Sequence, residues 1–145
     1  MRKDLRSRAE DSRSREPFYA FALYPNGFDA ALAILEVDLI HPDDTVPEIS
    51  LDWLAETFSA DDFGTPKISH SALPIGPAVR IRQNFAADTR SRRSPGILME
   101  TLTYGVLPNG AETALMLLMS WTVPGLSGEM EETADSIAET LTVDF

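Results

Sequence analysis

The chain has 145 residues, with 23 Asp and Glu against 12 Lys and Arg, and its formal net charge is −11. A charge of this size repels phosphate backbones and anionic headgroups, which excludes nucleic acid and membrane surfaces as main partners. The sequence has no cysteine, which excludes disulfides, thiolate metal sites and cysteine nucleophiles.

The length predicts a single domain, because a chain of this size buries about two-thirds of the surface that its unfolded form exposes. The longest apolar run, residues 114–123, is about half as long as a membrane-spanning helix. The basic N-terminal residues are not followed by the apolar stretch of a secretion signal. We therefore expect a cytoplasmic protein.

Residues 1–16 consist mostly of charged side chains and serine, and they carry six of the 12 Lys and Arg. Such a segment buries too little apolar area to offset its ordering entropy, which predicts a disordered charged tail. The tail either solubilises the chain or serves as a docking arm for an acidic partner. The predicted domain covers residues 17–145.

Two strands and a short helix are predicted first along the domain. Residues 18–24 are rich in aromatic side chains, and residues 29–40 end in an alternation of apolar and acidic side chains, which favours two strands. The Pro-Asn-Gly sequence between them is typical of a turn. Ser50 is a suitable N-cap for a helix whose apolar side chains recur at the i, i+3, i+4, i+7 spacing.

A second hairpin is predicted where residues 67–73 and 78–85 flank a Pro-Ile-Gly-Pro turn. In its second arm, apolar residues alternate with Arg80 and Arg82, which is typical of a half-buried strand. The next residues, 86–96, predict an exposed loop.

The most apolar stretch follows this loop. Residues 97–106 predict a strand, and the Asn109-Gly110 step predicts a two-residue hairpin turn. Six consecutive apolar residues, 114–119, predict a strand that is apolar on both faces and runs through the middle of a sheet. Ser127 is predicted to cap a final amphipathic helix.

The sequence contains an internal echo, because the pattern that starts at Phe21 recurs 83 positions later at Tyr104. Both copies hold an Asn-Gly turn, and each is followed by a helix with a serine cap. Chance is the alternative explanation, since Asn-Gly turns between apolar strands are common. Six strands and two amphipathic helices predict an α+β domain: a largely antiparallel sheet of about six strands, in ββα-ββ-ββα order, with two packed helices.

Equivalent positions of the echo also predict the two faces of the sheet. Leu32 and Ile34 are expected to share one face with Leu115 and Leu117. The opposite face then holds Leu35, Val37, Met116 and Leu118. Because both faces are apolar at the centre, they must be covered by helices split between the faces, by a long loop, or by a second subunit.

Motifs that carry chemistry are missing from the sequence. It has no nucleophile elbow, phosphate-binding loop, dinucleotide fingerprint or zinc-protease helix motif. His41, near Asp43 and Asp44, has no second histidine at ligand spacing, and His70 has no nucleophile beside it. No catalytic residue, cofactor or metal site is therefore predicted.

The candidate partner-binding site is a group of five arginines. They are Arg80, Arg82, Arg90, Arg92 and Arg93. The first two project from one face of a strand, and the following loop carries the other three. Guanidinium groups suit carboxylates and phosphates, so an acidic segment of a partner is expected to dock there. The alternative is that these arginines pair internally with Glu100 and its neighbours.

Residues 73–82, Leu-Pro-Ile-Gly-Pro-Ala-Val-Arg-Ile-Arg, and the apolar spacing from Met130 to Leu141 resemble small actinobacterial proteins of unassigned function. Those proteins are similar in element order to the PsbP-like fold, an antiparallel sheet flanked by helices. The resemblance covers residues 18–145 and implies a non-catalytic adaptor or accessory protein. It transfers no site residues, and the missing signal peptide differs from the envelope-associated members.

These features predict a non-catalytic protein-interaction or accessory module. Its partner is another protein or a second copy of the chain, bound through an apolar sheet face or through the arginines. The alternative is an acidic secretion chaperone or immunity-type protein, which binds a basic partner through its carboxylates. A small enzyme is the third hypothesis, and it requires a pocket in which His41 or His70 meets a carboxylate.

Overall fold

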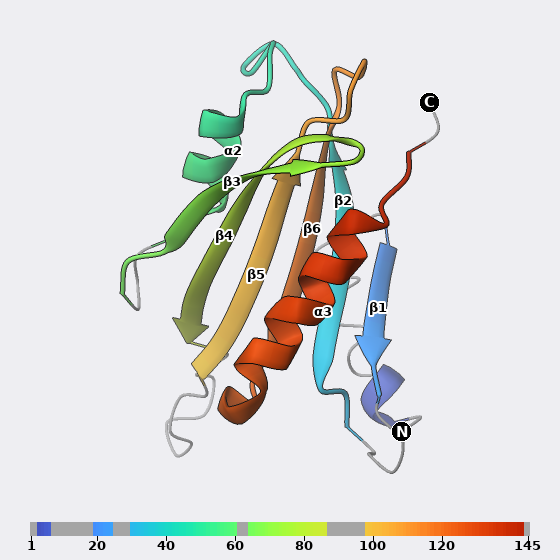
Figure 1. The fold of residues 1–145 in the computed structure, drawn as a ribbon, viewed down its shortest axis with the longest axis vertical. Coiled ribbons are helices and arrows are strands. Elements are labelled where there is room, and N and C mark those ends of the chain that lie inside the picture. Colours follow the sequence, from blue (N-terminus) through green and yellow to red (C-terminus); the bar gives the residue numbers. More distant parts are fainter. Residues whose placement is uncertain (1–2, 7–18, 25–29, 61–63, 87–97, 144–145) are drawn as a thin grey trace.

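A computed structural model describes residues 3–6, 19–24, 30–60, 64–86 and 98–143 (Figure 1). The strands are β1 (Tyr19–Leu23), β2 (Ala33–Ile40), β3 (Lys67–Leu73), β4 (Gly76–Ala86), β5 (Leu98–Val106) and β6 (Ala114–Trp121). The longer helices are α2 (Leu51–Phe58) and α3 (Ser127–Glu139), the latter preceded by the 3-10 turn Pro124–Leu126. The element order is the predicted one.

The six strands form one open antiparallel sheet in the order β1-β2-β6-β5-β4-β3. Strands β3 to β6 are neighbours in sequence and in space, as in a meander. The β1–β2 hairpin joins the other side of β6. This arrangement confirms the predicted α+β class with a largely antiparallel sheet.

Strand β6 lies inside the sheet, with β2 on one side and β5 on the other. Its side chains alternate between fully and half-buried: Leu115, Leu117 and Met119 are buried, while Met116 and Leu118 are half-buried. Neither face of the strand is therefore fully exposed, although the face with Met116 and Leu118 is less buried. The prediction from the apolar run is confirmed.

The two helices cover opposite faces of the sheet (Figure 1). The Tyr104 hydroxyl donates a hydrogen bond to Asp135 of α3, whereas a Cβ placed on the next residue, Gly105, would lie 3.1 Å from the Cβ of Leu54 of α2. Because successive residues of a strand point to opposite faces, these contacts define an α3 face and an α2 face. Both helices pack on the sheet, as predicted.

The core is divided unequally between the two faces. The α3 face holds the larger cluster, which includes Leu102, Leu117 and Trp121 from the strands and Met130, Ala134 and Ala138 from α3. The α2 face holds a smaller one, formed by Ile49, Leu54, Val79, Ile81 and Ala114. Since α2 has eight residues and α3 has 13, the α2 face receives less cover.

The predicted distribution of side chains between the faces is wrong. Leu35 lies opposite Met119, and Val37 lies opposite Leu117, so these residues share the α3 face. Ile34 lies opposite Ser120 on the α2 face, with Met116 and Leu118. The register pairs even-numbered residues with even-numbered ones, whereas an offset of 83 matches even with odd. Equivalent positions of the echo therefore point to opposite faces.

The connection between β5 and β6 is longer than the predicted two-residue turn. It comprises residues 107–113, within which Ala111 N–H donates to Pro108 O at 3.2 Å, and Gly110 has a φ of 78°. Asn109 N–H donates to Ile75 O at 2.8 Å, and this bond connects the β5–β6 connection to the β3–β4 turn. The Asn-Gly step does form a turn, but this turn does not join the strands directly.

One of the two predicted helix caps is confirmed. The Ser50 hydroxyl accepts a hydrogen bond from Trp53 N–H at 3.1 Å, as an N-cap does. For α3 the prediction is wrong, because Leu126 occupies the N-cap position and makes no side-chain cap. The Ser127 hydroxyl donates instead to Glu100 at 2.5 Å. This donated bond ties the start of α3 to Glu100 of β5.

Residues 3–6 of the predicted tail are helical. The Asp4 carboxylate accepts hydrogen bonds from the Tyr24 hydroxyl at 2.6 Å and from Ala31 N–H at 3.1 Å. These contacts hold the segment beside the β1–β2 hairpin. The rest of the predicted disordered tail lies outside the described residues.

Candidate functional site

Arg80 reaches from β4 to α3. Its guanidinium group contacts Asp135 at 2.9 Å and Glu131 at 3.2 Å. These two acids are one helical turn apart, so they present their carboxylates side by side to the strand. Burial alone would lower the pKa of Arg80, but its bonds to Asp135 and Glu131 raise that pKa above its ordinary value.

Tyr104 completes this cluster from β5. Its hydroxyl donates to Asp135 at 2.5 Å, beside Arg80. Burial and the neighbouring carboxylate raise the pKa of Tyr104 to about 12. Burial alone would also raise the pKa of Asp135, but hydrogen bonds from Arg80 and Tyr104 lower it. Each charge therefore already has its partner within the fold.

Arg82 forms a second and more buried cluster. Its guanidinium group lies 2.6 Å from Glu100 and 5.1 Å from the ring centre of Trp121, and the side chains of Arg82 and Glu100 are 13% and 12% exposed. Glu100 also accepts from Trp121 Nε1–H at 2.9 Å and from the Ser127 hydroxyl. Burial would raise the pKa of Glu100, but the bonds from Ser127, Arg82 and Trp121 lower it.

The described arginines of the candidate site are therefore engaged internally. The alternative prediction, that these arginines pair internally with Glu100, is confirmed for Arg82. A cavity of about 220 Å³ does lie beside them, lined in part by Lys67 and Glu131. The charges of Lys67, Arg80 and Arg82 are balanced there by those of Glu100, Glu131 and Asp135. The remaining predicted residues, Arg90, Arg92 and Arg93, lie outside the described residues.

The two histidines lie apart from these clusters. His41 Nδ1 is 3.0 Å from the Thr113 hydroxyl oxygen, and His70 is exposed on β3. Among the described residues, no group of three or more His, Asp and Glu is placed to hold a metal ion. Neither His41 nor His70 lines the cavity beside the arginines or any of the three cavities described below.

An apolar opening lies on the α2 face. We call it the α2-face groove; it has a volume of about 360 Å³ and runs across β2, β6, β5 and β4. Its apolar lining consists of Ile34, Phe58, Phe85, Met99, Met116 and Leu118. Its polar lining consists of Glu36, Gln83, Thr101, Thr103 and Ser120. The sheet forms the floor, and the end of α2 forms one wall.

The groove exists because α2 ends early. The helix packs over Val79 and Gly105 through Leu54 and ends at Phe58, so no helix of the described residues covers the rest of this sheet face. Gln83 fixes this end: its Nε2–H donates to Phe58 O at 2.6 Å, and its Oε1 accepts from Ala60 N–H at 2.8 Å. A buried amide thus holds the wall of the groove against the floor.

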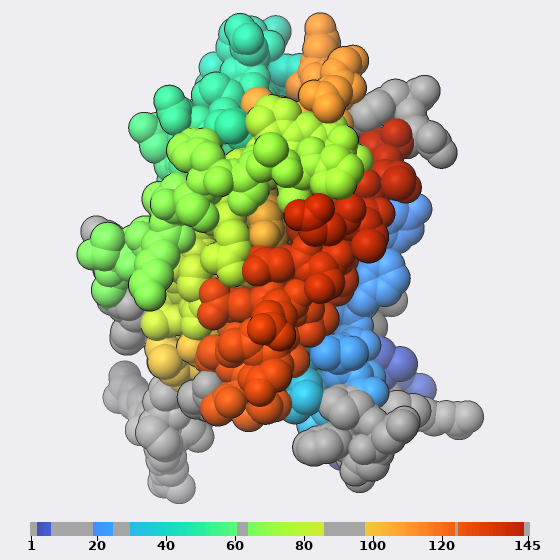
Figure 2. All heavy atoms as spheres, in the orientation of Figure 1, coloured from blue at the N-terminus to red at the C-terminus, as the bar shows by residue number. Residues whose placement is uncertain are grey.

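A second apolar patch lies along β1 on the other face. Tyr19 and Phe21 are each 56% exposed and Leu23 is 40% exposed. These residues lie opposite Val37, Leu35 and Ala33 respectively, which places them on the α3 face. Figure 2 shows β1 bordering α3 on this side, and a small cavity of about 120 Å³ lies between the two elements.

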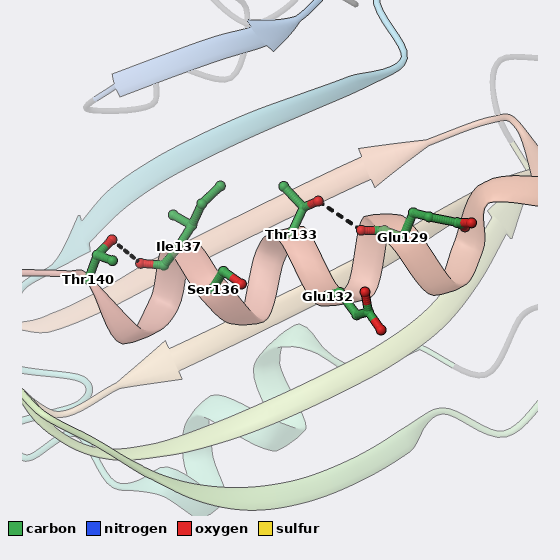
Figure 3. A pocket seen from close by; sticks show the side chains of 6 residues that line it. All are labelled: Glu129, Glu132, Thr133, Ser136, Ile137 and Thr140. Atoms are coloured by element: carbon green, nitrogen blue, oxygen red, sulfur yellow. Dashed lines mark hydrogen bonds between the residues drawn. The ribbon is translucent and has the colours of Figure 1, made fainter.

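The surface hollow along α3 is wider but open. It measures about 600 Å³, and its six lining side chains come from α3 and its C-cap residue, Thr140, as Figure 3 shows: Glu129, Glu132, Thr133, Ser136, Ile137 and Thr140. The Thr133 and Thr140 hydroxyls donate to carbonyls of their own helix. A depression lined by one helix has no opposing wall, so it does not enclose a ligand.

Comparison with known proteins adds no family. No family model matches the sequence, and no curated protein matches it significantly. Within the described residues, none of the helices is long and apolar enough to cross a membrane.

The sequence analysis did not predict the groove, although the sequence contains one feature that points to it. The apolar residues on both sides of β6 predict two sheet faces that need cover. The early end of α2 at Phe58 decides which part stays open, and this depends on tertiary contacts such as that of Gln83. No local pattern links Gln83 to a helix end 25 residues earlier.

Proposed function

We propose that the protein is a non-catalytic interaction module that binds a protein partner through the α2-face groove. The observation that carries this proposal is the open apolar floor, built from the central strands of the sheet and lined by Met116 and Leu118. Apolar surface is typical of interaction sites on folded domains, and here it alternates with polar side chains such as Thr101, Thr103 and Ser120. The floor itself is held rigidly by strand pairing on both sides.

The chemistry of the groove favours binding over catalysis. The ionisable groups with shifted pKa values belong to the clusters around Arg80 and Arg82, on the α3 face. The described lining of the groove has one carboxylate, on Glu36, and otherwise amides, hydroxyls and apolar side chains. A small enzyme is thus the weaker proposal, as is a role for the arginines in binding an acidic segment.

The predicted setting of the module is retained in the proposal. We place it in the cytoplasm, as the sequence predicts. Its partner is a protein rather than nucleic acid or membrane, because the charge of −11 repels anionic surfaces. The PsbP-like resemblance is consistent with an antiparallel sheet between helices, and it stays a prediction. The alternative, an acidic secretion chaperone or immunity-type protein, would bind a basic partner through its carboxylates instead.

The groove is tested by removing its apolar character. With Met116→Gln/Leu118→Gln, we expect loss of a protein that the natural chain captures from a lysate, because two amides expose polar groups where the partner buries apolar ones. Partners are identified by mass spectrometry, and thermal unfolding confirms that the variant is folded.

The matched control is Leu98→Gln/Val123→Gln, which changes two apolar residues that are 41% and 38% exposed and do not line the groove. This control should retain the partner. Retention by the groove variant, or the absence of any captured protein, contradicts the proposal.

Self-association through β1 is a second candidate, favoured by the exposed side chains of Tyr19, Phe21 and Leu23. In the described sheet β1 is an edge strand, and its sequence, Tyr-Ala-Phe-Ala-Leu, carries no charge. Two copies related by a twofold axis at Phe21 would pair aromatic with apolar side chains. The uncharged strip lets two acidic chains approach at this edge.

Sedimentation equilibrium tests this edge. We expect a dimer for the natural chain and a monomer for Phe21→Lys, because a lysine at the twofold axis places two like charges in contact. Ile68→Lys is the control, since Ile68 is 46% exposed on the opposite edge strand, β3, and should leave the dimer intact. A monomeric natural chain, or a dimer that Phe21→Lys leaves intact, contradicts this candidate.

A further inference from the structure

Strand β3 is the second edge of the described sheet, and it carries few of the features that protect an edge. Its pairing with β4 runs without a break from Lys67 to Leu73, so the strand has no bulge. It contains no proline, and Lys67, at its first position, is its one lysine, arginine or carboxylate. Sheets usually protect an exposed edge with a bulge, a proline or several charges. The outer side of β3 is therefore suited to pairing with a further strand.

The backbone of β3 presents hydrogen-bonding groups on this outer side. The Pro77 carbonyl accepts from Leu107 N–H at 3.0 Å, so the backbone of Pro77 faces β5 rather than β3. Ala72 lies opposite Pro77, and its N–H and C=O therefore point away from β4. Because this orientation recurs at every second residue of a strand, the same holds for His70 and Ile68. All three of these β3 residues are exposed.

The side chains of β3 follow the same alternation. Ile68 lies opposite Ile81, which belongs to the core cluster of the α2 face, and Ile68 itself is 46% exposed. A residue of an added strand opposite Ile68 would share this face, where an apolar side chain extends the contact. Lys67 lies opposite Arg82, on the α3 face.

Lys67 adds a preference for negative charge. Among the described residues Lys67 makes no ion pair, whereas Arg80 and Arg82 contact carboxylates of their own chain. The backbone of Lys67 faces β4, so an added antiparallel strand would meet it in a non-hydrogen-bonded pair. Opposite side chains are closest in such pairs, and a carboxylate there would pair with the lysine.

We propose that the outer edge of β3 binds an extended segment of a partner protein as an additional antiparallel strand, with an apolar side chain beside Ile68 and an acidic one beside Lys67. Main-chain hydrogen bonds provide the affinity in this mode of recognition, and alternate side chains provide the specificity. The site is separate from the α2-face groove and goes beyond the proposed function.

The test uses the full chain and a blocked peptide with the seven-residue length of β3. The peptide has valine at every second position, threonine between the valines, and glutamate at its last position. In an antiparallel pair this glutamate lies opposite Lys67, and the valine N–H groups face β3. Titration followed by NMR gives the dissociation constant.

Amide hydrogen exchange shows where the peptide binds. We expect exchange to slow at Ile68, His70 and Ala72, whose N–H groups point outward. The N–H groups of Ser69 and Ser71 face β4, so their exchange should change much less.

Methylated peptides distinguish strand addition from other binding. N-methylation of the valines removes the donors that face β3 and should weaken binding at least about 10-fold. N-methylation of the threonines blocks only the far edge of the peptide and should weaken it by less than about threefold. Equal effects of the two modifications would contradict strand addition.

His70→Pro is the matched change in the protein. Proline is tolerated in an edge strand where its N–H would face away from the sheet. The variant should therefore unfold at nearly the same urea concentration as the natural chain but bind the peptide at least about 10-fold more weakly. Ser69→Pro removes an N–H that faces β4 and should unfold at a clearly lower concentration. If His70→Pro does not fold, the methylated peptides decide the question on the natural chain.

The charge preference is tested with lysine in place of the glutamate of the peptide. This change should weaken binding by about threefold or more, because it places two like charges opposite each other. The net charge of −11 favours the lysine peptide, so a preference for glutamate reports the contact with Lys67. In Lys67→Met the preference should disappear. A natural chain that prefers the lysine peptide would overturn the acidic part of the inference.

The remaining outcomes identify another site or another occupant. Binding that Met116→Gln/Leu118→Gln abolishes would place the peptide in the groove, which supports the proposed function and overturns this inference. Self-association of the natural chain that His70→Pro abolishes would make the occupant a second copy. No binding, or binding that a folded His70→Pro variant leaves unchanged, would remove β3 as the site and leave the groove untouched.

Discussion

Replacing Arg82 with methionine is expected to lower the free energy of unfolding by about 3–5 kcal/mol at neutral pH. The change leaves the charge of Glu100, which is 12% exposed, without its cationic partner at 2.6 Å. The remaining bonds from Trp121 and Ser127 do not neutralise that charge. Chemical denaturation of the variant and the natural chain measures the difference.

Acid should reduce this difference. Because the pKa of Glu100 in the fold is lowered from 4.5, its stabilising contribution is complete above that value and is lost as pH falls through the folded-state pKa. Below that point Glu100 is protonated and no longer needs Arg82. The control is Lys67→Met, an exposed cation opposite Arg82, which should change stability by less than about 0.5 kcal/mol. Equal stability of the natural chain and Arg82→Met at pH 7 would contradict the argument.

Alanine at Gly76 is expected to destabilise the fold by about 3 kcal/mol or more. A Cβ at this position would lie 2.1 Å from the backbone oxygen of Leu107, and the residue has a φ of 154°. The clash separates the β3–β4 turn from the β5–β6 connection, which are joined by a hydrogen bond from Asn109 N–H to Ile75 O. Urea unfolding with and without the substitution gives the value.

Gly110→Ala is the matched control for this effect. Gly110 also has a positive φ, 78°, but a Cβ there would meet nothing within 4 Å. Its replacement should cost about 1 kcal/mol, the strain of the backbone alone. If the two variants lose the same stability, the contact with Leu107 is not what requires glycine at position 76.

The elements of the fold were predictable because their signals are local. The alternation around Arg80 and Arg82 gives a half-buried strand, the apolar spacing after Ser50 gives a helix, and the six apolar residues 114–119 give an interior strand. Each of these depends on residues within a few positions of one another. The predicted order of strands and helices follows from the same patterns.

The placement of partners across the fold was not predictable in this way. Arg80 meets Glu131 and Asp135, 51 and 55 positions later, and nothing in the local sequence selects these acids over the other carboxylates. The division of side chains between faces was predicted wrongly because it depends on the register between β2 and β6. A shift of one residue in that register exchanges the two faces.

The arginines illustrate the same limit at the candidate site. The strand pattern correctly places Arg80 and Arg82 on one face, but it does not tell whether that face is turned to a partner or to a helix of the same chain. The structure puts α3 over Arg80, with its acids in contact. The groove on the other face depends on the end of α2, which the sequence pattern alone does not link to Gln83.

The pairing of β2 with β6 has a consequence for how the protein forms on the ribosome. Val37 and Leu117 are opposite each other, 80 positions apart, whereas β3, β4, β5 and β6 pair with strands that are next in sequence. The N-terminal hairpin is therefore synthesised long before β6, the strand on which it docks. Until β6 is made, the apolar side chains of the hairpin lack their partners in the sheet. Nascent chains stopped before residue 114 should keep this hairpin within reach of chaperones that bind apolar segments.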